Sequence, residues 1–137
     1  MKPILISIVS MVISATTHAA NISVEVQNIK ESSGKIGCAL YDEADGFPME
    51  ASYVAQQWLE ADKNGVTCTF DGIPDGIYAI SVSHDVNENK ETDTNLFGIP
   101  KEDWGVTNNV RPKMRAPTFD EAKFEVDGDT QLVVRID

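Results

Sequence analysis

The sequence has few of the residues on which common catalytic and metal-binding sites depend. Its 137 residues include only two cysteines and two histidines. Two cysteines exclude a disulfide-dense miniature scaffold and a zinc site built mainly from thiolates. One histidine, His18, lies in the N-terminal segment, so His84 alone remains and excludes a metal site with several histidine ligands. Because there is also no Gly-x-Ser-x-Gly turn, we assign no catalytic residue.

Basic residues are scarce as well. Eleven Lys and Arg against 22 Asp and Glu give a formal net charge of -11, and the sequence pI is about 4.4. Phosphate backbones and anionic membrane surfaces would be repelled, so nucleic acid is excluded as a partner. The length and the 42% hydrophobic content suit one domain with one core.

Long hydrophobic runs are limited to the N-terminus. Lys2 precedes an apolar stretch at residues 4–13, and small residues follow up to Ala19. This pattern is typical of a secretory signal peptide. A membrane anchor is the alternative, but it needs about 20 apolar residues. We expect residues 1–19 to be a signal peptide and residues 20–137 a single domain, periplasmic or secreted, with no membrane span after signal cleavage.

Alternating apolar and polar residues dominate the rest of the chain. This period predicts short strands at residues 22–27, 35–41, 66–70, 77–84, 122–126 and 132–136. The sequence Asp127-Gly128-Asp129 between the last two predicts a hairpin. Residues 49–61 differ, because their apolar residues recur at helical spacing, and we expect one short helix or a helical crossover there.

Residues 96–118 have no sustained period and contain several glycines and prolines. A segment of this length in a small domain is usually functional or disordered, and its apolar residues argue against disorder. We expect it to fold over one end of the sheets. The sequence therefore predicts an all-β protein, a two-sheet β-sandwich of about seven strands with one short helix and a long end loop, and a barrel is the alternative.

Cys38 and Cys68 fall on the inward positions of two predicted strands. In an exported protein they are expected to form a disulfide, which would restrict the unfolded chain by roughly 3 to 4 kcal/mol. Two buried free thiols are the alternative.

An acidic, amide-rich segment follows His84. Asp85, Asn87, Asn89 and Asp93 have a spacing similar to that of a calcium-binding loop, in which alternate oxygen ligands surround the ion. Lys90 replaces the glycine of that loop, and its final glutamate is missing. A possible calcium ligand set is thus Asp85, Asn87, Asn89 and Asp93, and a solvated polar turn is the alternative.

Residues 84–109 resemble the bacterial domain-of-unknown-function family 2141 in their His-Asp-x-Asn start and their Gly-Ile-Pro-x-Glu and Asn-Asn sequences. Residues 76–79 and 117–122 are also similar to that family. The resemblance implies an exported β-sandwich similar to the Ig-like or prealbumin-like type or to the carboxypeptidase-regulatory type, and it implies no activity. Glu88 and Lys90 stand where small or glycine residues are usual in the family.

Two functional hypotheses follow. The first is a non-catalytic binding or structural module of the cell envelope, with an envelope protein, peptide or glycan as its partner. The second is a small hydrolase of the transthyretin-like fold that uses His84 with Asp85 or Glu102. Fold alone does not separate the two, and a lone inward-facing histidine is more often a hydrogen-bonded structural residue than a base.

Overall fold

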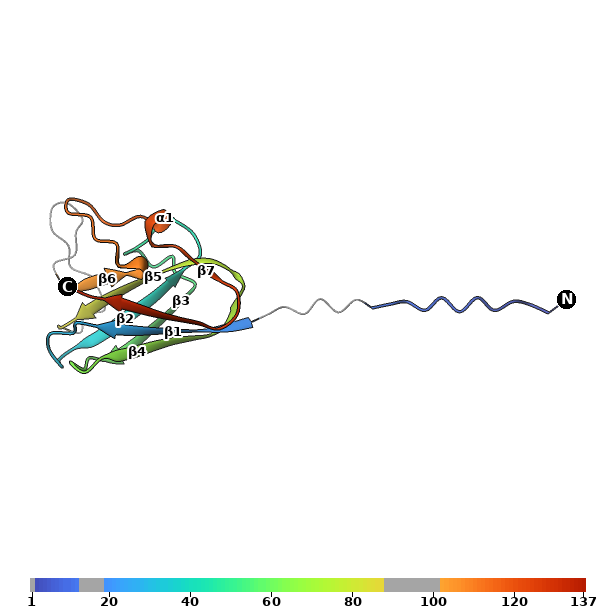
Figure 1. Ribbon diagram of the computed structural model, residues 1–137, viewed down its shortest axis with the longest axis horizontal. Helices are drawn as coiled ribbons and strands as arrows, with labels where there is room; N and C mark the ends of the chain where they lie inside the picture. The colour runs from blue at the N-terminus through green and yellow to red at the C-terminus, as the bar shows by residue number, and fades with distance from the viewer. Residues whose placement is uncertain (1, 13–18, 88–101) are drawn as a thin grey trace.

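The protein is a β-sandwich of two sheets. The computed structural model describes residues 2–12, 19–87 and 102–137 (Figure 1). The three-stranded sheet has the order β4-β1-β8, and the five-stranded sheet has the order β3-β2-β5-β6 with β7 also paired to β5. The strands are β1 (Ala19–Gln27), β2 (Lys35–Tyr41), β3 (Ala55–Glu60), β4 (Val66–Pro74), β5 (Gly76–Asp85), β6 (Trp104–Val106), β7 (Phe124–Val126) and β8 (Thr130–Arg135).

The core lies between the two sheets and follows the period of two. Ile22, Val24 and Val26 of β1 are fully buried, and the residues between them are exposed or half-buried. On the facing sheet, Ile80 and Val82 of β5 are also fully buried. The inward positions predicted from alternation are confirmed here, because one face of each strand removes its apolar side chains from water.

The disulfide joins the two sheets through this core. Cys38 lies on β2 in the five-stranded sheet and Cys68 on β4 in the three-stranded sheet, and their sulfur atoms are bonded at a sequence separation of 30. Both residues are fully buried. The predicted pairing is therefore confirmed.

The helix predicted over residues 49–61 is wrong, because that region ends in strand β3. Two side chains break the strand's alternation. Gln57 occupies an inward position but lies at the sheet edge, where its Oε1 accepts a hydrogen bond from the backbone N–H of Thr69 at 2.7 Å. Trp58 is apolar but faces outward. With a polar residue inward and an apolar residue outward, the apolar residues of this region recur at helical rather than alternating spacing, and the sequence therefore predicted a helix.

The predicted hairpin at Asp127-Gly128-Asp129 is also wrong. The turn exists, and Gly128 has a φ of +88° that favours glycine. However, β7 pairs with β5 in one sheet, whereas β8 runs parallel to β1 in the other. The turn therefore carries the chain from one sheet to the other. The residues of a turn determine that the chain reverses direction, but they do not determine which strands the flanking segments pair with.

The described part of the long segment, residues 102–118, packs against the five-stranded sheet. It contains β6 and a 3-10 turn, η1 (Thr107–Asn109). Thr107 Oγ1 accepts from the N–H of Ile80 at 3.2 Å and donates to the carbonyl of Ala122. These bonds attach the segment to β5 and to the short helix α1 (Phe119–Ala122), whose first turn is closed by a capping box between Thr118 and Glu121.

The N-terminal segment lies outside the sandwich. Its large apolar side chains from Ile4 to Val12 are more than four-fifths exposed, and Figure 1 shows the segment extending away from the sheets. Within the described ranges, no helix has the length and hydropathy needed to cross a membrane. The inter-sheet disulfide and this exposed hydrophobic segment together indicate an exported protein.

Candidate functional site

The outer face of the five-stranded sheet has a row of paired residues that runs across four strands. Gly37 of β2 pairs with Trp58 of β3 on one side and with Ser83 of β5 on the other. Ser83 pairs in turn with Trp104 of β6. Directly opposed residues in a sheet project from the same face. Two small residues therefore lie between two tryptophans, which leaves a depression in the sheet surface.

The neighbouring row has the same character. Ala39 of β2 pairs with Gln56 of β3 and with Ser81 of β5, and Ser81 pairs with Val106 of β6. Adjacent positions on β2 and β5 thus present only small side chains outward. The floor of the depression consists of Gly37, Ala39, Ser81 and Ser83, and it lies close to the sheet backbone.

Aromatic side chains form one end of this depression. The Tyr41 ring meets the rings of Phe47 and Tyr53 edge to face, with centroid distances of 5.2 and 6.2 Å. The Tyr41 hydroxyl donates to the backbone carbonyl of Glu50 at 2.8 Å, which fixes the segment before β3 over the sheet. Burial raises the pKa of Tyr41 to about 12, so this hydroxyl keeps its proton in the physiological range.

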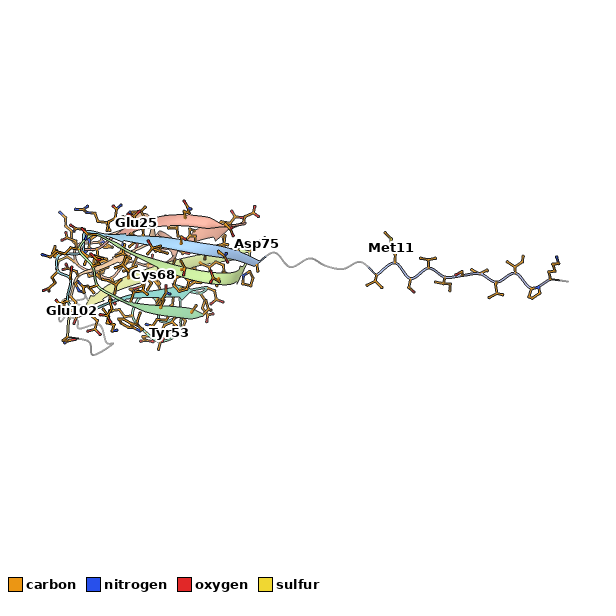
Figure 2. All side chains as sticks on the ribbon, turned by 90° about the horizontal axis from the view of Figure 1, so that it is seen from below. Met11, Glu25, Tyr53, Cys68, Asp75 and Glu102 are labelled. Carbon is orange, nitrogen blue, oxygen red and sulfur yellow. A yellow bond between two sulfur atoms is a disulfide. The ribbon has the colours of Figure 1, made fainter. Side chains whose placement is uncertain are left out.

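Together these residues form a groove of about 570 Å³, here called the outer-face groove. Figure 2 shows Tyr53 on this broad face and Glu25 on the opposite one, with Cys68 between them. Of the residues that the structure describes, eleven line the groove and none of them is charged. They are Gly37, Ala39, Tyr41, Pro48, Met49, Ala51, Tyr53, Gln56, Trp58, Ser81 and Ser83.

Trp104 lies beyond the groove floor and is held rigidly. Its side chain is 6% exposed, and the guanidinium carbon of Arg111 lies 4.0 Å from the ring centroid in a cation–π contact. Arg111 also donates to the backbone carbonyl of Trp104. The two tryptophans therefore differ, because Trp58 borders the groove and Trp104 is packed beneath an arginine.

His84 lies at one end of the core rather than in the groove. It is 1% exposed, and its Nε2 donates to the carbonyl oxygen of Ser33 at 2.6 Å. A carbonyl oxygen can only accept, so Nε2 carries the proton and only Nδ1 remains as a candidate base. Its backbone N–H donates to the carbonyl of Asp103 at 2.9 Å. These contacts agree with a hydrogen-bonded structural role.

A second hollow of about 410 Å³, the end hollow, is lined by Lys30, Glu31, His84, Val86, Glu102 and Asp103. It brings His84 and Glu102 together, as the hydrolase hypothesis requires, and Figure 2 places Glu102 at this end of the sandwich. Asp85 follows His84 on the same strand, so its side chain has the opposite parity. The pairing of His84 with Asp85 is therefore disfavoured by the strand geometry.

Lys30 supplies positive charge at the mouth of the end hollow. Its ammonium lies 2.7 Å from Oδ1 of Asp137 and 3.4 Å from Oδ2 of Asp103. The hydrogen bond to Asp137 raises the pKa of Lys30; desolvation opposes this shift, and the charge of Asp103 adds to it. The ion pair between Lys30 and Asp137 links the segment after β1 to the last residue of the sequence, so it holds two chain segments together at the surface.

The calcium prediction falls only partly on described residues. Asp85 ends β5 with a buried side chain, and Asn87 is exposed. Asn89 and Asp93 lie outside the described residues. Within residues 2–12, 19–87 and 102–137, no group of three or more His, Cys, Asp or Glu residues is placed to hold a metal ion. Calcium binding stays a prediction.

Sequence reasoning did not find the outer-face groove. Its signal was present in the small outward residues of β2 and β5, Gly37, Ala39, Ser81 and Ser83. Two facts were needed to use it: that β2 pairs with β5, and that residues 55–60 form a strand beside β2. Neither follows from the period of a single segment.

An inter-sheet disulfide, a sandwich of three and five strands and an uncharged surface groove define a small β-sandwich module suited to an extracytoplasmic location. The model of the family described as an uncharacterized protein conserved in bacteria (DUF2141) matches residues 24–133, and the chain belongs to this family. The resemblance noted in the sequence is thereby confirmed. Neither a curated protein nor a solved structure matches the chain.

Proposed function

We propose that the chain is an exported, non-catalytic binding module of the cell envelope and that its ligand occupies the outer-face groove. The observation that carries this proposal is the lining of the groove. All eleven lining residues are uncharged, in a chain whose residues are 24% charged. Concave sites with aromatic walls and a few polar groups are the usual form of ligand pockets.

The opposite face of the sandwich supports this assignment by contrast. The outward positions of β1, β4 and β8 include the exposed polar residues Glu25, Thr67 and Gln131. This face also exposes Val133 and has a hollow of about 440 Å³, but the described lining of that hollow contains the charged residue Glu25 and no aromatic side chain. The five-stranded sheet instead presents Trp58 and Tyr53 around a floor of small side chains, which a purely structural module would not require.

The binding function is tested by filling the groove. In Ser81→Leu a larger side chain should occupy the floor, whereas Thr67→Leu makes the same kind of change on the exposed face of the other sheet. Each protein is immobilised and exposed to an envelope extract. We expect a component retained by the wild type and by Thr67→Leu to be lost from Ser81→Leu. Equal retention by all three, or no retention by the wild type, would contradict the proposal.

A second candidate, a small hydrolase, is supported by the shared location of His84 and Glu102 in the end hollow. The contact between Nε2 and Ser33 leaves His84 one ring nitrogen for proton transfer, and its burial limits access. A substrate screen tests this candidate. A turnover that His84→Ala abolishes while Ser81→Leu preserves would place the function in the end hollow.

A further inference from the structure

The indole of Trp58 forms a flat, supported surface at the edge of the outer-face groove. A Cβ atom at Gly37 would lie only 2.6 to 2.9 Å from three atoms of the Trp58 ring. The ring therefore rests directly on the β2 backbone across the β2–β3 pair. Trp58 is half-buried and lines the groove with its remaining surface. A ring supported in this way is fixed before a ligand arrives, so little side-chain entropy is lost on binding.

Neutral hydrogen-bonding groups lie beside this surface. Ser81 and Ser83 contribute hydroxyls from β5, Gln56 contributes an amide from β3, and all three residues line the groove with Trp58. Hydroxyl and amide groups both donate and accept. The groove thus combines an aromatic surface with uncharged donors and acceptors.

The absence of charge among the described lining residues restricts the ligand. A phosphorylated or carboxylated ligand would meet no cation there and would be repelled by the net charge of -11. A cationic ligand would find no carboxylate in the lining. A purely apolar ligand would leave the Ser and Gln groups without hydrogen bonds once water is excluded, which is costly. A peptide strand adds to a sheet edge, whereas this groove lies on a sheet face.

We infer that the outer-face groove binds a neutral oligosaccharide, with one pyranose ring packed on Trp58 and its hydroxyls bonded to Ser81, Ser83 and Gln56. A pyranose ring has a face of C–H groups and a rim of hydroxyls, which match the aromatic surface and the polar groups respectively. The volume of about 570 Å³ falls within the range of small-ligand sites, about 300–1,000 Å³. This inference rests on the proposed binding function and names its ligand class.

The test is a titration of the exported protein with chitohexaose, cellohexaose and maltohexaose, followed by calorimetry and by tryptophan emission. A hexamer of galacturonate serves as the charged comparison. We expect at least one neutral hexasaccharide to bind and to change the emission of Trp58, and the charged hexamer not to bind. Trp58→Ala should weaken binding about tenfold, the loss of one aromatic stacking contact. Trp58→Phe should retain part of the affinity because it keeps a ring.

The matched variants separate this inference from the binding function. Ser81→Leu should abolish saccharide binding, and Thr67→Leu should leave it unchanged. If no neutral saccharide binds while Ser81→Leu still loses an envelope component, the saccharide is wrong and the groove function stands. If Trp58→Ala and Ser81→Leu both bind a saccharide as tightly as the wild type does, the saccharide binds elsewhere and the assigned site is wrong. If Ser81→Leu behaves as Thr67→Leu with saccharides and with the extract, both proposals are overturned.

Discussion

The Trp58 ring covers Gly37 so closely that a Cβ atom at position 37 would stand 2.6 Å from Cζ3 of the indole. The two residues are directly opposed on β2 and β3. Position 37 therefore accepts no side chain while the ring keeps its place. Gly37 forms part of the floor of the outer-face groove and Trp58 forms part of its wall.

Gly37→Ala should lower stability, because the added methyl group must displace the ring or the strand. Overpacking of this kind typically costs about 1–3 kcal/mol. Urea unfolding measures the loss. In a Trp58→Ala background the clash is gone, so Gly37→Ala should then cost much less. The same loss in both backgrounds would show that the ring does not rest on Gly37.

The disulfide should stabilise the sandwich by constraining the unfolded chain. Replacing Cys38 and Cys68 together by alanine should lower the free energy of unfolding by about 3 to 4 kcal/mol on the chain-entropy model. The native fold should remain, since the apolar inward faces of both sheets are intact. Mass spectrometry without reductant should find no free thiol in the wild type. Alkylation of both cysteines under those conditions would refute the bond.

Acid should weaken the cap of α1. The hydrogen bond from Arg115, with further bonds from Thr118, lowers the pKa of Glu121 from 4.5 to about 2. A depressed pKa in the folded state stabilises above pH 4.5, and this contribution disappears as the pH falls toward about 2. Arg115→Gln should therefore melt below the wild type at pH 6, by a small amount because the pair is exposed. The two melting curves should converge near pH 2, and a constant difference would contradict this assignment.

The calcium prediction concerns Asp85, Asn87, Asn89 and Asp93. An ion that binds only the folded protein stabilises it by about 2.7 kcal/mol at 100 times Kd. The melting temperature should rise with calcium and rise less with magnesium, which dehydrates reluctantly. Asp93→Asn should reduce the response. If a chelator leaves the melting temperature of the wild type unchanged, the segment is a polar turn.

The strands whose two faces differ were predictable from the sequence. β1 and β4 alternate because one face meets the core and the other meets water. β3 was not predictable, because Trp58 faces outward onto Gly37 and Gln57 faces inward at the sheet edge. β6 was missed for another reason: its three residues are too few to show a period.

The same limit applies to the end hollow and to the outer-face groove. Properties of a single strand position could be predicted from the sequence, but the neighbours of that position on other strands could not. The inward position of His84 was predictable, since alternation along its strand is a local property, and its burial and its bond to Ser33 agree with a hydrogen-bonded residue. The groove depends on register, which places Gly37 beside Ser83 and Ala39 beside Ser81. Register is set by pairing between segments that are distant in the sequence. The small residues alone were therefore not enough to predict a groove.

The most direct test of the outer-face groove as the binding surface is a map of amide chemical shifts. Isotope-labelled protein is titrated with the three neutral hexasaccharides, and each backbone N–H is followed. We predict that the amides of Gly37, Ala39, Ser81 and Ser83 shift together with the Trp58 indole N–H, while those of Glu25 and Thr67 stay in place. Shifts confined to the three-stranded sheet or to the end hollow around His84 would contradict the account.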